Sequence, residues 1–292
     1  METLLTLSRL TDHLGKTFIL AYQEETQDLT NSLTQAGCDC EVLRQAHQPE
    51  YKTYSRSFLC LMNHQGAWRR ALQADKPTLI VEADFVPVNN FSQLPPPYES
   101  SENLGIAWLY TCAPQIYSVS ANGYAEGYST SLVAYVITPQ SAQNLLDHAA
   151  TIETTKGPTA YSAWDSDIDS FLRDRGFRNY VPFRNYGEHG GLPNPEHHQN
   201  RLSKSHRADL LYGKLAFTPL YALSDGKKNR LKFLAIRCYA RLKGIARLLL
   251  GKYLRGPVLA SSENPIRLLK FALSRHFVRR YSSAGLRFPS NR

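Results

Sequence analysis

The order of short apolar segments in the first third of the chain restricts its fold most. Apolar runs predict buried strands, and between them apolar residues recur at the three- and four-residue steps of helices. The predicted elements are, in order, a strand at 17–22, a helix at 24–36, a strand at 40–44, a helix at 58–74 and a strand at 78–81. Strand, helix, strand, helix, strand is typical of a parallel sheet wound with helices, so we expect an α/β fold with a mostly parallel central sheet.

The next part of the chain continues this pattern and then becomes irregular. Residues 106–110 and 131–137 predict further strands. A helix should begin at Thr138-Pro139, because threonine is a good helix cap and proline suits the first turn. Residues 184–206 are rich in Gly, Pro, His and Asn, so we expect a long loop of the kind that is often functional.

Composition narrows the class of protein. The chain has 292 residues, of which 42% are hydrophobic and 20% charged, and this excludes a disordered protein. No apolar run reaches the roughly 18 to 20 residues that cross a membrane, and the start of the chain lacks the cations of a signal peptide. We therefore expect a cytoplasmic protein. Its five scattered cysteines should be reduced thiols, because they show no zinc-binding spacing.

Charge is divided unevenly along the chain. Residues 227–292 carry 17 Lys and Arg against one acid, Glu263, whereas the rest carries 17 Lys and Arg against 24 Asp and Glu. This split predicts an α/β domain at 1–225 and a basic helical tail at 226–292. Apolar residues of the tail recur at helical spacing among its cations up to Tyr253, which predicts an amphipathic helix that is broken or softened at Gly244 and Gly251.

Two carboxylates follow a predicted buried strand directly. The run 78–81 leads into Glu82 and Asp84. Ligands of open α/β sheets gather at the carboxyl ends of strands, and a pair of carboxylates there could hold a hard divalent cation that in turn binds a diphosphate. The alternative is a surface turn with two solvated acids.

The sequence around these carboxylates resembles glycosyltransferase family 25, the lipopolysaccharide-type glycosyltransferases. The resemblance covers roughly residues 15–215 and rests on two blocks in the same order and spacing. The matching residues are Asn63-His64 and Trp68 on a helix, the strand and Glu82-Ala83-Asp84 after it, and later Ala134-Tyr135 to Leu145-Leu146. The middle acid of the family's Glu-Asp-Asp triplet is Ala83 here, which places the metal preference in doubt.

The resemblance implies a GT-A-like fold and transfer of a sugar from a nucleotide sugar to a glycan or glycolipid, with inversion at the anomeric carbon. Glu82 and Asp84 would hold Mn²⁺ or Mg²⁺ and the donor, because the metal stabilises the diphosphate leaving group. The acceptor hydroxyl needs a base, for which Asp165, Asp167 and Asp169 are the candidates. These acids could instead begin a helix, where acidic residues are favoured.

Other donor-side candidates are less specific. Tyr22 follows the first strand, where such folds contact the nucleotide, and His64 could be a donor-side or a packing residue. In the polar loop, His206 could be a third metal ligand, and Lys204 or Arg207 could lie near the diphosphate. The adjacent histidines His197 and His198 in that loop also suggest a zinc site, although their spacing fits no known zinc-binding motif.

The basic tail leaves three alternatives. It suits a membrane surface with anionic lipids, which agrees with a lipid-linked acceptor and with a peripheral position on the inner face of a membrane. It could instead pack its apolar stripe on the domain and leave its cations in solvent. Nucleic acid is the third possibility, but no recognised nucleic-acid fold accompanies the charge. For the whole protein, a non-catalytic binding or scaffold protein of the same fold remains the alternative to an enzyme.

Overall fold

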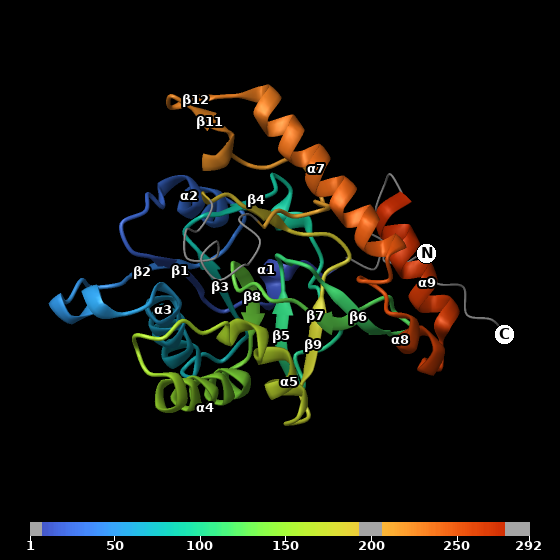
Figure 1. Ribbon diagram of the computed structural model, residues 1–292, viewed down its shortest axis with the longest axis horizontal. Coiled ribbons are helices and arrows are strands. Elements are labelled where there is room, and N and C mark those ends of the chain that lie inside the picture. The colour runs from blue at the N-terminus through green and yellow to red at the C-terminus, as the bar shows by residue number, and fades with distance from the viewer. Residues whose placement is uncertain (1–7, 193–205, 278–292) are drawn as a thin grey trace, which may run out of the picture.

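An eight-stranded mixed sheet forms the centre of the computed structural model, which describes residues 8–192 and 206–277 (Figure 1). The strands of this sheet lie in the order β2-β1-β3-β8-β5-β9-β7-β6. Their bounds are β1 Thr17–Ala21, β2 Cys40–Arg44, β3 Thr78–Glu82, β5 Leu104–Trp108, β6 Gln115–Val119, β7 Ala125–Tyr128, β8 Ala134–Ile137 and β9 Arg178–Val181. Two small two-stranded antiparallel sheets lie outside it, β4 Phe85–Pro87 with β10 Gly187–His189, and β11 Leu223–Ser224 with β12 Lys227–Lys228.

Helices connect and cover these strands. The α-helices are α1 Leu10–His13, α2 Gln27–Gln35, α3 Arg56–Ala71, α4 Pro139–Lys156, α5 Ile168–Arg173, α7 Arg230–Leu249, α8 Gly256–Ser261 and α9 Pro265–Phe277. Short 3₁₀ turns occur at Pro49–Thr53, Phe91–Gln93, Trp164–Ser166 and Leu220–Ala222. Thr138 caps α4 as expected, since its side chain accepts a hydrogen bond from the backbone N–H of Ser141.

The central sheet is mostly parallel, as the sequence predicted. Strand β1 runs parallel to β2 and β3, and β5 runs parallel to β9. Strands β8 and β7 run antiparallel to each of their neighbours in the sheet. Six of its eight described strands therefore point in one direction, which brings the carboxyl ends of β1, β3 and β5 to one edge.

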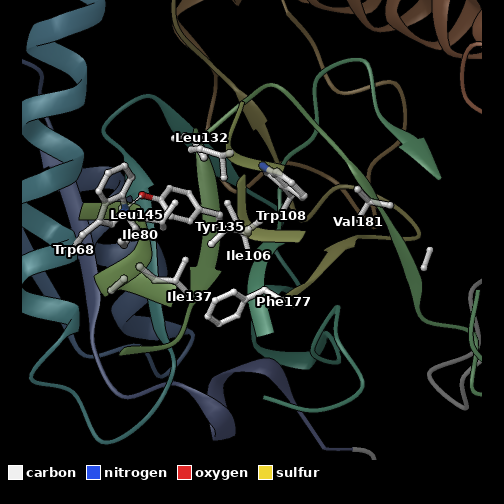
Figure 2. Packing of buried hydrophobic residues seen from close by; sticks show 14 of the residues in the cluster. Trp68, Ile80, Ile106, Trp108, Leu132, Tyr135, Ile137, Leu145, Phe177 and Val181 are labelled. Carbon is white, nitrogen blue, oxygen red and sulfur yellow. Dashed lines mark hydrogen bonds between the residues drawn. The ribbon is translucent and has the colours of Figure 1, made fainter. Parts of the chain in front are cut away.

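Alternate residues of each strand enter two apolar layers. Phe18 and Leu20 pack with α3, α4 and α9 in one layer, whereas Ile19 packs with α1 and α2 in the other. Figure 2 shows part of the first layer, where the indole N–H of Trp68 donates to the hydroxyl of Tyr135. Because helices cover both faces of the central sheet, its inner strands are continuous apolar runs in the sequence. This is why the sequence predicted them.

Two stretches differ from the sequence-based expectation. Residues 111–130 contain the hairpin β6–β7, which was not predicted. The expected loop 184–206 contains β10, which pairs antiparallel with β4 about one hundred residues earlier. Strand β10 consists of glycine and polar residues, so it has no alternation of apolar side chains that would predict a strand. Only its hydrogen bonding to β4 defines it as one. Residues 193–205 of that loop lie outside the described part.

The C-terminal helices pack on the α/β body. Leu268, Phe271 and Ala272 of α9 belong to the same apolar layer as α3 and α4. Helix α7 is continuous through Gly244, where the missing Cβ leaves room for Asp209, and it ends at Leu249, just before Gly251 with its positive φ. The division at 225/226 stays a prediction. In the described ranges, no helix has both the length and the apolar character needed to cross a membrane.

Candidate active site

A cavity of about 380 Å³ opens at the carboxyl end of β3. Its lining comes from the β3–β4 turn, the stretch before β8, the segment around Trp164 and the β10 region. The chemically active side chains on its wall are Cys60, Glu82, Asp84, Cys112, Asp165, His189 and His206. The cavity therefore brings together residues more than one hundred positions apart, at the edge where the sequence predicted a ligand.

Glu82, Asp84 and His189 form a group that could hold a metal ion, with one ligand atom of each within 4.8 Å of the others. Glu82 ends β3, and the backbone N–H of Ala83 donates to Leu20 of β1, which fixes the turn. Ala83 is not among the residues that line the cavity. The absence of an acid at position 83 therefore leaves both carboxylates that face the cavity in place.

His189 reaches this group because β10 pairs with β4. The register sets His189 opposite Phe85, and the backbone N–H of Gly190 donates to the carbonyl of Asp84 at 2.7 Å. The imidazole Nε2 then lies 2.9 Å from Oδ2 of Asp84. A Cβ on Gly191 would overlap the Asp84 carboxylate, so a glycine is required where the chain passes the site.

The charges of this pair support each other. Burial alone would lower the pKa of His189, but the Asp84 carboxylate outweighs it and raises the pKa to about 9. Burial would raise the pKa of Asp84, yet the charge of His189 and its hydrogen bond hold that pKa below the usual value. Without a metal ion, an imidazolium therefore faces a carboxylate at neutral pH.

The donor set fits a divalent cation. Oδ1 of Asp84 is buried and has no hydrogen-bond partner among the described residues, so one carboxylate oxygen is left for a ligand. Two carboxylates and one imidazole suit Mn²⁺ better than Mg²⁺, which prefers oxygen ligands alone. The Nε2 proton of His189 must leave before that nitrogen can bind a metal.

Glu82 is oriented by a buried hydrogen-bond chain. Trp68 donates to the hydroxyl of Tyr135, which lies 2.8 Å from Nδ1 of His64, and Nε2 of His64 lies 3.3 Å from Glu82. One arrangement of protons satisfies every contact: Tyr135 donates to Nδ1, and Nε2–H donates to Glu82. His64 is thus both a packed core residue and a positioning residue for Glu82.

Asp165 lies on the cavity wall, and the structure separates it from the other two candidate bases. Burial and the nearby Glu82 charge raise the pKa of Asp165 to about 7. Asp167 is exposed and precedes α5. Asp169 is buried, where it accepts hydrogen bonds from Tyr117, Arg173 and Asn179. Neither Asp167 nor Asp169 lines the cavity.

The remaining predicted residues lie around the cavity. His206 lines it, with Nδ1 2.7 Å from the sulfur of Cys112. Arg207 is not among the residues that line the cavity; it donates to the carbonyls of His189, His206 and Gly191, so it holds the β10 segment in place. Tyr22 ends outside the cavity lining, with its hydroxyl 3.1 Å from His47. Lys204 lies outside the described residues.

The sequence-based reasoning did not assign His189. The stretch containing it is polar, but nothing local in it indicates the pairing with β4. The signal that could have found it is the pair Gly190-Gly191 directly after a histidine, because adjacent glycines often mark a close approach of the backbone to another group. The partner of that approach is visible only in three dimensions.

Comparisons with known proteins give little further information. No protein-family model and no curated protein matches the chain. Among solved structures, it is similar to a glycosyltransferase involved in the glycosylation of the major capsid of PBCV-1, with a TM-score of 0.39 and 8% sequence identity. The match covers 57% of this chain and 81% of that one.

Proposed function

We propose that the protein is a metal-dependent glycosyltransferase that moves a sugar from a nucleotide sugar to a glycan or lipid-linked acceptor. The observation that carries this proposal is the group Glu82, Asp84 and His189 at the carboxyl end of β3, with Asp165 on the wall of the same cavity. A cation site and a carboxylate that titrates near neutrality are the two parts that such a transfer requires.

Each part has a distinct task. A bound Mn²⁺ or Mg²⁺ would stabilise the negative charge that develops on the departing nucleoside diphosphate. Glu82, Asp84 and His189 would bind that cation, and His64 would keep the Glu82 carboxylate turned toward it. Gly191 would leave room for the Asp84 side chain.

Asp165 would act as the base. The acceptor oxygen forms a bond to the anomeric carbon while the bond from that carbon to the diphosphate oxygen breaks, and the hydroxyl proton passes to Asp165. A carboxylate with a pKa near 7 takes up a proton more readily than an ordinary aspartate, which suits this role at neutral pH. Inversion at the anomeric carbon is part of the proposal through the family resemblance.

The donor-binding roles of Tyr22, Lys204 and Arg207, and a metal contact by His206, are retained as proposals. For Arg207 we favour an indirect role, since its guanidinium donates to the backbone carbonyls on either side of the site. A lipid-linked acceptor would place the enzyme at the cytoplasmic face of a membrane.

Calorimetric titration tests the proposal. Uridine, guanosine and cytidine nucleotide sugars are titrated into the protein with and without Mn²⁺, using wild type, Asp84→Asn and the control Asp75→Asn. Asp75 is an exposed acid in the turn before β3, so its loss should change nothing. We expect Mn²⁺-dependent binding of one nucleotide class that Asp84→Asn abolishes.

Turnover separates an enzyme from a binding protein. If the donor binds but no nucleoside diphosphate is released in the presence of candidate acceptors or of water, the non-catalytic alternative is favoured. If no donor binds to wild type under any condition, the transferase proposal is wrong.

A further inference from the structure

Helix α7 has its apolar stripe on the outside. Leu231, Cys238, Leu242 and Leu249 are spaced by seven, four and seven residues, so they lie on one helix face. All four are exposed, with 80% of Leu231, 59% of Leu242 and 80% of Leu249 accessible. Leu234 and Tyr239, also exposed, extend this stripe on either side.

The opposite face of α7 points to the body and carries arginines. Arg237 pairs with Glu188, which is fully buried, and also donates to the carbonyl of Ala208 at 2.7 Å. Arg247 donates to the carbonyl of Ala113 at 2.9 Å. A buried carboxylate must be paired, so these contacts fix which face of α7 turns inward. The leucines are thereby held in solvent.

Helix α9 has a second exposed apolar row. Its Leu268, Phe271 and Ala272 are buried, whereas Ile266, Leu269, Leu273 and Phe277 are exposed on the other side. Arg241 of α7 donates to the carbonyl of His276, so a hydrogen bond joins α7 to the last turn of α9 (Figure 1). We call the exposed apolar residues of α7, with Leu250 directly after it, the outer face; its members are Leu231, Leu234, Cys238, Tyr239, Leu242, Leu249 and Leu250.

Cations accompany this outer face without acids among them. Residues 226–262 contain no Asp or Glu. The exposed cations on α7 and just before it are Lys227, Lys228, Arg230, Lys232 and Lys243, and the exposed acid Asp225 precedes them. Apolar side chains beside lysines and arginines match the interface of an anionic bilayer, where leucines enter the acyl boundary and cations meet lipid phosphates.

We propose that the outer face docks on a membrane surface rich in anionic phospholipid, with α7 lying in the plane of the interface. A second copy of the chain is a poorer occupant, because two such cationic faces would repel each other. Membrane docking would bring the proposed transferase to a lipid-linked acceptor, and only this consequence rests on the proposed function. Docking itself requires no turnover.

Docking would also be connected to the candidate active site. Arg237 on the inner side of α7 holds Glu188, the residue directly before His189. The helix that meets the lipid is therefore joined to the strand that carries the third metal-binding residue. The cavity is thus held at a fixed position relative to the membrane surface.

Vesicle flotation with the full chain tests this. Vesicles of phosphatidylcholine alone are compared with vesicles containing about three tenths phosphatidylglycerol. We expect wild type to float with the anionic vesicles and to be released by high salt. Leu242→Gln/Leu249→Gln leaves the charge unchanged and should weaken the partition at least tenfold, because two exposed leucines no longer enter the lipid.

Charge is tested with a matched pair of variants. Lys232→Gln/Lys243→Gln removes two cations beside the outer face and should weaken binding about tenfold or more. Lys76→Gln/Lys156→Gln removes two exposed cations from other parts of the molecule and should bind as wild type does. Thermal unfolding and nucleotide-sugar titration of each variant show that the fold and the cavity are intact.

The possible outcomes are distinct. Absence of wild-type binding to anionic vesicles, or leucine variants that bind as wild type does, would overturn the inference. So would a concentration-dependent dimer that Leu242→Gln/Leu249→Gln converts to a monomer, because the occupant would then be a second copy. If the protein binds anionic vesicles but no nucleotide sugar, membrane docking is supported and only the proposed transferase activity is refuted.

Discussion

Nε2 of His189 lies 2.9 Å from Oδ2 of Asp84, although the two residues are 105 positions apart in the chain. The contact exists because β10 pairs with β4 and because Gly190 and Gly191 let the backbone pass close to the carboxylate. It turns an acidic pair that could have been a solvated turn into a three-residue group with an imidazole.

Metal binding should depend on pH through His189. The pKa of this imidazole is raised to about 9, so at neutral pH the metal must displace its proton. Apparent Mn²⁺ affinity should therefore fall as pH is lowered below about 9, by up to tenfold per unit. Calorimetry in buffers of different ionisation enthalpy should detect close to one proton released per ion at pH 7. His189→Gln should abolish that release, and an unchanged proton count would refute the assignment.

Asp165→Asn should remove turnover and keep donor binding. The side chain keeps its shape but cannot accept the hydroxyl proton, so we expect kcat to fall about 10²- to 10⁴-fold. In wild type, kcat/KM should rise with pH as Asp165 loses its proton, with a midpoint at or below about 7, since a bound cation would lower the pKa further.

The matched control for that variant is Asp167→Asn, which changes an exposed acid two residues away that does not line the cavity. It should leave kcat within about twofold of wild type, the scatter expected for a surface substitution. Equal losses in the two variants would exclude Asp165 as the base.

Gly191→Ala should damage the metal group without unfolding the protein. A Cβ at this position would overlap Oδ2 of Asp84 and force the carboxylate away from His189. We expect Mn²⁺ binding to be lost, as measured by calorimetry. Gly66→Ala is the control, because a Cβ there meets no atom within 4 Å in the middle of α3. That variant should bind Mn²⁺ normally and be stabilised by about 0.5–1 kcal/mol.

The ion pair between Asp209 and Arg275 should anchor α9. Arg275 is fully buried, so Asp209→Asn would leave an uncompensated charge and lower the free energy of unfolding by about 3–5 kcal/mol. Urea unfolding at pH 7 measures this loss. Glu41→Gln breaks the exposed pair with Arg70 and should cost less than about 1 kcal/mol.

The same pair gives a pH dependence with a defined sign. Burial would raise the pKa of Asp209, but Arg275 outweighs it and holds the pKa below the usual 3.8. The stability from this carboxylate is present above its unfolded pKa and is lost as pH falls through the lower folded value. Asp209→Asn should therefore flatten the acid limb of the wild-type stability curve below about pH 4.

The sequence by itself determined the helices and strands whose signals lie within a few neighbouring residues. The strands β1, β2, β3, β5 and β8 and the helices α2, α3 and α4 follow from apolar runs, caps and stop residues within a few positions of each other. The carboxylates after β3 followed in the same way, because the end of a strand and its acids are adjacent in the chain. The mostly parallel sheet followed from the alternation of these elements.

The tertiary structure decided what depends on distant partners. It chose Asp165 among three candidate acids, because only this one reaches the cavity wall, and it supplied His189 through a strand pairing that has no apolar period. It also turned the leucines of α7 outward. Amphipathic spacing defines a helix face but not the direction in which that face points, and here a buried Glu188 that requires Arg237 fixed the direction.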